Sequence, residues 1–215
     1  MRTILVTNAT QYTGPGAVGI LCAAGHRVVC HDPTFGDDDT VRAFQASHPQ
    51  VLVLRKPDPA GIVSELADRV GLVDAVVSND VYPLTKALVE DVSVDDLRRT
   101  FEAVLVFPYQ LAQMLLPEMK ARRDGCFVFV TSARQLRPEP GYSVPTAIRA
   151  GTTAFAQALS KEVAAFARST LLRPTTCTAR CTTPVRALSI AKKGPNRSPI
   201  LSLPVDWAPR KKSES

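Results

Sequence analysis

The chain has 215 residues and 45% apolar side chains, enough for the core of one globular domain. Its formal net charge of +6 would fit a nucleic-acid-binding surface, but residues 1–166 carry 16 basic and 18 acidic side chains, whereas residues 167–215 carry 10 and 2. The basic charge therefore belongs to the C-terminal segment, and no nucleic-acid partner is expected. No apolar run approaches the ~20 residues of a membrane span, so no membrane partner is expected either.

The chain begins at once with a strand-like segment, and a signal peptide with a long apolar region is not apparent. Its five cysteines are an odd number without the spacing of a disulfide framework. Cys177 and Cys181 lack His or further Cys partners at zinc-site spacing, so no metal is expected. These features predict a cytoplasmic protein.

Up to about Phe166 the sequence alternates short apolar runs with segments of helical periodicity. Strands are predicted at Thr3–Asn8, Arg27–Asp32, Val51–Leu54, Val73–Asp80 and Gly125–Ser132. Helices are predicted from the end of the Ala9–Gly16 loop to about Ala24, and at Asp38–Ser47, Pro57–Val70, Val94–Lys120 and Ser143–Phe166. This alternation predicts an α/β fold with a doubly wound parallel sheet, Rossmann-like, joined by right-handed crossovers.

The longest predicted helix, Val94–Lys120, carries apolar side chains at helical spacing. We expect its buried stripe to comprise Leu97, Phe101, Val104, Leu105, Leu111, Leu115 and Leu116. A kink is expected at Pro108.

The loop after the first strand is the first place to look for a nucleotide cofactor. It contains Gly14, Gly16 and Gly19, but the early glycine of G-x-G-x-x-G is missing, and the bulky Tyr12 stands where the backbone should approach a pyrophosphate. We therefore expect the glycines to serve a tight turn and close helix–strand packing. Asp32 could bind a ribose hydroxyl, but without a phosphate cradle a cap or turn role is favoured.

The stretch from Gly125 to Arg149 has the layout of an active site. It predicts a buried strand that ends on Ser132, a Pro-rich loop, and a helix that carries Arg149 in its first turns. The alternative to an active site is a purely structural role for both residues: the serine caps the strand end, and the arginine is a solvated charge on the helix.

Several of these segments resemble the halohydrin dehalogenases, which belong to the short-chain dehydrogenase/reductase superfamily and have lost nucleotide binding. The resemblance rests on T-N-A-T-Q-Y-T-G-P-G, C-H-D, V-S-N-D, T-S-A and R-A-G, and it spans Met1 to about Phe166. It implies a cofactor-independent lyase that converts a vicinal halohydrin to an epoxide plus halide.

The resemblance also implies roles for individual residues. Family members use a Ser-Tyr-Arg set, in which Ser132 would hold the substrate oxygen and Arg149 would lower the pKa of the tyrosine base. Tyr12 and Pro83 would line the substrate and halide pocket, so that Tyr12 blocks the cofactor site. Family members are typically homotetramers, with interface helices that correspond to the two long helices here.

The tyrosine is where this sequence departs from the family. Four residues before Arg149 stands Pro145, which has no titratable group, in the first turn of a helix for which Ser143 is the expected cap. Tyr142 is the nearby phenol. It is a candidate for the replacement base, although helix geometry does not place it beside Arg149. The alternative is that Tyr142 is a loop residue that packs on the surface.

Residues 167–215 change character, with six prolines, six threonines and one aromatic residue, Trp207. If the third base of each codon is joined to the first two bases of the next, the segments Arg173–Pro184 and Val205–Ser215 can be read in another frame. In that frame they permit two motifs of the family, P-N-N-L-Y-S-E and R-L-G-T-Q-E-E. We therefore predict a Rossmann-like domain at 1–166 and a frameshifted, poorly ordered tail at 167–215, in which the last strands of the fold are missing or replaced.

Three functions are compatible with this sequence. The first is a halohydrin dehalogenase-like protein whose activity is compromised by Pro145 and by the tail. The second is an NAD(P)-dependent short-chain oxidoreductase, which Tyr12, the incomplete glycine pattern and Arg149 in place of lysine argue against. The third is a non-enzymatic, truncated fragment.

Overall fold

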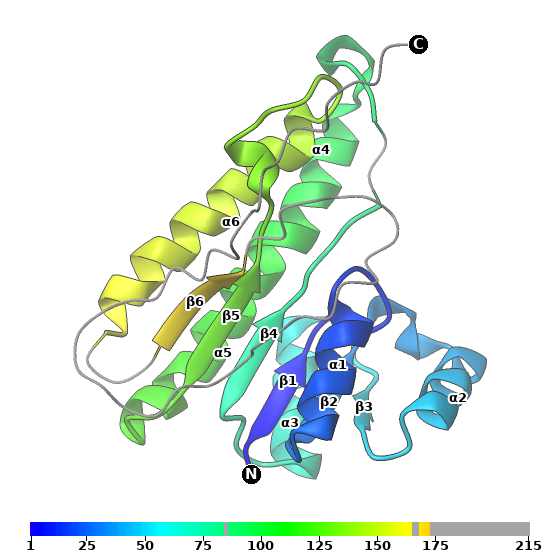
Figure 1. The fold of residues 1–215 in the computed structure, drawn as a ribbon, viewed down its shortest axis with the longest axis vertical. Coiled ribbons are helices and arrows are strands. Elements are labelled where there is room, and N and C mark those ends of the chain that lie inside the picture. The colour runs from blue at the N-terminus through cyan, green and yellow to red at the C-terminus, as the bar shows by residue number, and fades with distance from the viewer. Residues whose placement is uncertain (84–85, 165–167, 173–215) are drawn as a thin grey trace, which may run out of the picture.

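The computed structural model describes residues 1–83, 86–164 and 168–172, and it has the predicted α/β architecture (Figure 1). Six parallel strands form one sheet in the order β3-β2-β1-β4-β5-β6, with helices on both faces. The strand order reverses between β1 and β4, which is where ligands bind in open sheets of this kind. None of the helices in the described ranges has the length and apolarity to cross a membrane.

The elements follow one another in strict alternation. The strands are β1 (Thr3–Val6), β2 (Arg27–His31), β3 (Leu52–Leu54), β4 (Ala75–Ser78), β5 (Cys126–Val130) and β6 (Arg168–Leu172). The helices are α1 (Gly14–Ala23), α2 (Asp38–Ser47), α3 (Pro59–Arg69), α4 (Val94–Phe101), α5 (Phe107–Ala121) and α6 (Ser143–Glu162). Predicted bounds differ from these by a few residues at most.

Helix starts are set by short polar side chains. The carboxylates of Asp37 and Asp58 accept hydrogen bonds from the main-chain N–H of Thr40 (2.8 Å) and Gly61 (2.9 Å) at the starts of α2 and α3. Each bond satisfies a donor that has no partner within the helix, so the sequence fixes where both helices begin.

Alternate residues along each strand pack on opposite faces of the sheet, and each face has its own apolar core. One core lies beneath α1 and α2 and includes Ile4, Val6, Val28, Cys30, Val53, Val77, Val128 and Val130. The other lies beneath α3, α5 and α6 and includes Leu5, Val29, Leu54, Val76, Phe127 and Phe129. Because both faces are covered, the strands are apolar at almost every position, as the sequence predicted.

The sequence predicted that the last strands of the fold are missing or replaced, and the structure has a sixth strand in the sheet. β6 pairs with β5 in parallel from Cys126↔Arg168 to Val130↔Leu172. The unusual composition of the segment after residue 166 obscured a five-residue run that can still add to the sheet. The predicted frameshift motifs, Cys177, Cys181 and Trp207 lie outside the described residues, so the predicted domain boundary stays a prediction.

The predicted long helix is interrupted by a π-helical turn, Glu102–Val106, between α4 and α5. The turn ends just before Pro108, which has no N–H to donate to the main-chain oxygen of Val104. That oxygen instead accepts a hydrogen bond from the hydroxyl of Thr152 on α6 (3.0 Å). The kink expected at Pro108 stays a prediction, and the interruption that the structure shows is the π-helical turn that precedes this residue.

The π-helical turn also changes which side chains are buried. Leu97 and Phe101, predicted to lie in the core, are 40% and 44% exposed, whereas Thr100 is 4% exposed. A π turn inserts one residue into the helical repeat, so the face that points inward shifts by about one position upstream of it. Leu111 and Leu115, downstream of the turn, are buried as expected.

Candidate active site

The polar residues that follow β4 and β5 lie at the same edge of the sheet. Ser132 follows β5 and begins a short 3₁₀ turn, Ala133–Gln135, where its hydroxyl accepts a hydrogen bond from the main-chain N–H of Arg134 (3.2 Å). Ser132 therefore does serve as a cap. The same hydroxyl still has a proton to donate, because accepting one bond leaves its O–H free for another partner.

Arg149 reaches from α6 to the ends of both strands. Its two terminal nitrogens donate hydrogen bonds to the main-chain oxygens of Val130 (2.6 Å) and Asp80 (2.7 Å). The solvated helix charge considered from sequence is thus not the arrangement adopted. A planar guanidinium can hold two acceptors at fixed spacing, so it joins α6 to β4 and β5.

Beneath this junction the carboxyl group of Asp80 is fully enclosed. Burial raises the pKa of Asp80, opposed by hydrogen bonds that include that from Ser78 and by the charge of Arg149. The Ser78 hydroxyl donates to it at 2.5 Å and the Asn8 side-chain amide at 3.3 Å. The carboxyl group therefore acts as a structural acceptor below the site.

Pro145 stands in the first turn of α6, which begins at Ser143 with Tyr142 as its N-cap residue. The expectation that Ser143 caps this helix is wrong, because Tyr142 occupies that position and makes no capping bond through its side chain. Its main-chain oxygen accepts the first helical hydrogen bond, from Thr146 (3.0 Å). Pro145 costs no hydrogen bond at this position, because N–H groups in a first turn have no helical acceptor.

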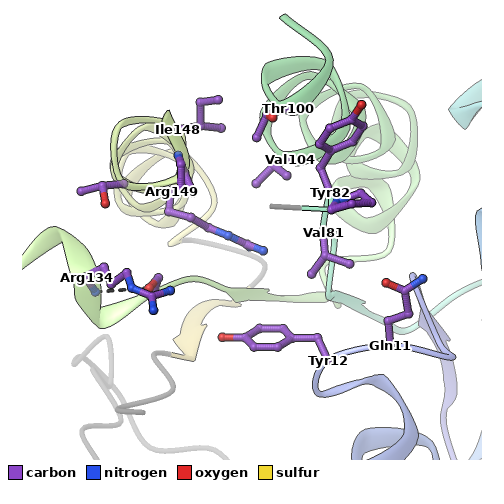
Figure 2. A pocket seen from close by; sticks show the side chains of 13 residues that line it. Gln11, Tyr12, Val81, Tyr82, Thr100, Val104, Arg134, Ile148 and Arg149 are labelled. Atoms are coloured by element: carbon purple, nitrogen blue, oxygen red, sulfur yellow. Dashed lines mark hydrogen bonds between the residues drawn. The ribbon is translucent and has the colours of Figure 1, made fainter. Parts of the chain in front are cut away.

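One cavity brings most of the predicted site residues together. Its volume is about 270 Å³, and Ser132, Pro145, Arg149, Tyr12 and Pro83 all border it. The remaining described residues that line it are Gln11, Val81, Tyr82, Thr100, Val104, Arg134, Thr146 and Ile148. Figure 2 shows this cavity, with Arg149 reaching into it from α6 and Tyr12 closing it from the loop after β1.

Tyr142 does not line this cavity, although it was the predicted replacement base. Its ring stacks on the guanidinium of Arg134, with the guanidinium carbon 3.9 Å from the ring centroid, and Lys86 lies 5.8 Å from the same centroid. The ring thus supports the outer side of the Arg134 side chain.

Sequence reasoning missed five polar residues of the cavity wall: Gln11, Tyr82, Thr100, Arg134 and Thr146. All of them except Thr100 are adjacent in sequence to a predicted site residue or two positions from one. Residues that are neighbours in sequence line the same pocket only where the local backbone turns. Composition does not reveal such a turn.

The loop after β1 is fastened by Asn79, which is fully buried. Its side-chain amide donates to the main-chain oxygens of Asn8 and Gln11, both at 2.9 Å, and its side-chain oxygen accepts from the hydroxyl of Thr13 (2.6 Å). These bonds fix the chain on both sides of Tyr12. Tyr12 itself has a φ of 55°, in the left-handed region that bulky residues seldom adopt.

The residues of this loop do not fit a dinucleotide. Asp32 is 2% exposed, and its carboxylate accepts hydrogen bonds from the hydroxyls of Thr10 (2.6 Å) and Thr34 (2.7 Å). Burial raises the pKa of Asp32, but these hydrogen bonds outweigh it and the pKa lies below its usual value. The prediction of a cap or turn role is confirmed, since Asp32 caps the 3₁₀ turn that follows β2.

The start of α1 offers few donors for a phosphate. The N–H of Gly14 donates to the main-chain oxygen of Gln11 (2.8 Å), and Pro15 has no N–H. A Cβ atom on Gly14 would lie 2.4 Å from the main-chain oxygen of Asn8, so the predicted close-packing role is confirmed there. It is wrong for Gly16 and Gly19, because a Cβ atom at either would meet nothing within 4 Å.

The described residues hold no group of three His, Cys, Asp or Glu side chains arranged for a metal ion. The polar side chains among the described residues that line the cavity are hydroxyl groups, phenols, guanidinium groups and the amide of Gln11.

The family model for short chain dehydrogenases matches residues 2–187. The chain belongs to the short-chain dehydrogenase family. A curated relative, dehydrogenase/reductase SDR family member 7B of Bos taurus, is 30% identical over 172 residues, which cover 74% of this chain and 53% of the relative. The chain thus spans about half the length of the curated relatives it matches.

Among solved structures, this family member is similar both to dehalogenases and to oxidoreductases. A halohydrin dehalogenase bound to ethyl (2S)-oxiran-2-ylacetate superposes with a TM-score of 0.77 and 33% identity, over 80% of this chain and 70% of the other. A protein described as a dehalogenation enzyme gives a TM-score of 0.75 and 32% identity, over 79% and 70%. An oxidoreductase of the family from Burkholderia thailandensis gives 0.72 and 26%, over 81% and 69%.

Proposed function

We propose that this chain is a halohydrin dehalogenase-like protein that binds a halohydrin, or an epoxide with halide, without a nucleotide cofactor. The observation that carries the proposal is that Ser132, Arg149, Tyr12 and Pro83 border one and the same cavity. The similarity to two dehalogenase structures at 32% and 33% identity supports it.

The cavity walls supply what a halohydrin needs for binding. The Ser132 hydroxyl can donate to the substrate oxygen, and the fixed charge of Arg149 favours negative charge that develops on that oxygen. Apolar side chains, among them Val81, Val104 and Ile148, suit the carbon skeleton. Pro145 removes the phenol from the family position, so the proton of the hydroxyl must pass to another group.

The alternative is an NAD(P)-dependent oxidoreductase, which the names of the curated relatives favour. Against it stand the buried, fully hydrogen-bonded Asp32 and the loop that holds Tyr12 over the edge of the sheet. The third possibility, a non-enzymatic fragment, would show neither ligand binding nor turnover.

A pair of titrations separates these functions. The full chain is titrated by calorimetry with bromide and styrene oxide, and separately with NADH and NADPH, while halide release from 1,3-dichloro-2-propanol is followed. We expect binding of bromide and the epoxide and no binding of either nucleotide. Saturable binding of NADH or NADPH, or failure of bromide and the epoxide to bind, would refute the proposal.

A further inference from the structure

The cavity contains a phenol, although not at the family position. The chain has four tyrosines, all of them in the described ranges, so the choice among them can be made for the whole sequence. Only Tyr12 and Tyr82 line the cavity, whereas Tyr142 stacks on Arg134 and Tyr109 packs on Phe155 with 5.0 Å between ring centroids. No Asp, Glu, His, Lys or Cys is among the described residues that line it. A proton acceptor there is therefore Tyr12 or Tyr82.

Tyr82 faces a different cation. It acts on Arg99, whose pKa it raises. Figure 2 shows the Tyr82 hydroxyl directed away from Thr100 and from the Arg149 side of the cavity.

Tyr12 faces the cations of the site. The guanidinium carbon of Arg149 lies 6.0 Å from the centroid of the Tyr12 ring. Figure 2 shows the hydroxyl end of Tyr12 directed toward the side of the cavity on which Arg134 lies. Arg149 borders the cavity, and its guanidinium is held there by the main-chain oxygens of Val130 and Asp80. Nearby cations stabilise the phenolate form of a phenol, as the family arginine does for its tyrosine.

The backbone at Tyr12 also indicates a role beyond filling space. A left-handed conformation at a bulky residue costs roughly 1–3 kcal/mol and persists only where the surroundings enforce it. Asn79 enforces it through hydrogen bonds to residues on both sides of Tyr12. The backbone conformation at Tyr12 therefore lowers the stability of the fold, while it holds this ring at the edge of the cavity.

We infer that Tyr12 has taken over the role of general base that Pro145 left vacant; the inference rests on the proposed function. In the ring-closing direction the Tyr12 phenolate accepts the proton of the substrate hydroxyl. The alkoxide oxygen then bonds to the neighbouring carbon, and the carbon–halogen bond breaks with its electron pair leaving on the halide. The phenol returns its proton to solvent, and Ser132 holds the oxygen throughout.

The test compares the full chain with three variants: Tyr12→Phe, Tyr142→Phe as a matched loss of a phenol outside the cavity, and Tyr12→Phe combined with Pro145→Tyr. Halide release from 1,3-dichloro-2-propanol gives kcat/KM, and calorimetry with styrene oxide gives binding. Circular dichroism melting shows that each variant is folded.

We expect Tyr12→Phe to lower kcat/KM by about 100-fold or more, the usual contribution of general base catalysis, while styrene oxide still binds. Tyr142→Phe should stay within about 3-fold of the parent, and Pro145→Tyr should restore turnover to the Tyr12→Phe chain. A Tyr12→Phe chain that keeps the parental rate, or loses turnover only as far as it loses epoxide binding, overturns the inference.

Two further results keep the inference separate from the proposed function. Epoxide binding without halide release in the parent, together with release after Pro145→Tyr alone, overturns the role of Tyr12 but supports the proposed function. Absence of both binding and release in the parent and in Pro145→Tyr refutes the proposed function and the inference with it.

Discussion

Arg149 donates a hydrogen bond of 2.7 Å to the main-chain oxygen of Asp80, which ties the first turns of α6 to the exit of β4. A second bond from the same guanidinium reaches the oxygen of Val130, the last residue of β5. We expect Arg149→Lys to lower the free energy of unfolding by about 1–3 kcal/mol, because one ammonium group cannot hold both oxygens and leaves one of them unsatisfied. Urea denaturation measures the change. Arg98 forms an exposed ion pair with Asp95, so Arg98→Lys is the matched control. It should change the free energy of unfolding by less than about 0.5 kcal/mol.

Asn79 holds the loop that carries Tyr12. Asn79→Ala leaves the main-chain oxygens of Asn8 and Gln11 and the hydroxyl of Thr13 without this partner. We expect a loss of about 2–4 kcal/mol in the free energy of unfolding and weaker binding of styrene oxide, because Tyr12 loses its enforced position. Denaturation and calorimetry on one preparation measure both. Unchanged binding in a destabilised Asn79→Ala chain would show that the position of Tyr12 does not depend on this side chain.

The glycines near the start of α1 should respond to alanine in opposite ways. A Cβ atom on Gly14 would lie 2.4 Å from the oxygen of Asn8 and 2.7 Å from that of Ala9, both of them main-chain atoms. Gly14→Ala should therefore destabilise the fold by about 2 kcal/mol or more, through overpacking. Gly16→Ala meets nothing within 4 Å and should stabilise it by about 0.5–1 kcal/mol, since alanine favours helix. Equal effects at the two positions, measured by thermal unfolding, would contradict this account.

His31 makes the fold sensitive to acid. Burial lowers the pKa of His31 to about 4 from its ordinary 6.5, against the opposing charge of Asp32. The folded state thus favours neutral imidazole, so the stability contributed by His31 is present above pH 6.5 and is lost as the pH falls toward 4. At 1.36 kcal/mol per pKa unit the loss is about 3 kcal/mol.

His31→Phe tests this, because the imidazole already stacks on Phe107 with 5.6 Å between ring centroids. The free energy of unfolding of the variant should fall less steeply between pH 7 and pH 4 than that of the parent. Parallel pH profiles for the two proteins would exclude His31 as the source of acid sensitivity.

The fold was predictable because its signals are local and repeated. The apolar strands, and capping residues such as Asp37 and Asp58, each fix an element independently of the others. Leu97 and Phe101 were misplaced because the π-helical turn changes which face of the helix points inward upstream of it. The spacing of apolar residues gives no sign of that turn.

The candidate site was predictable where it follows strand ends and one helical turn, as for Ser132 and Arg149. The position of Tyr142 could not be predicted from sequence, because it depends on the stacking of its ring on Arg134. The relation of Tyr12 to Arg149 was equally hidden, because it requires a left-handed backbone at a residue that rarely adopts it. Local propensity is weakest at residues held in strained conformations by distant partners.

Asp32 closes two turns at once, through Thr10 on one side and Thr34 on the other. Removing the carboxylate would loosen both loops, whether or not any nucleotide is ever bound. Asp32 therefore has a structural role at the end of β2 that needs no ligand. An acid with these partners is by itself no sign that the protein uses NAD.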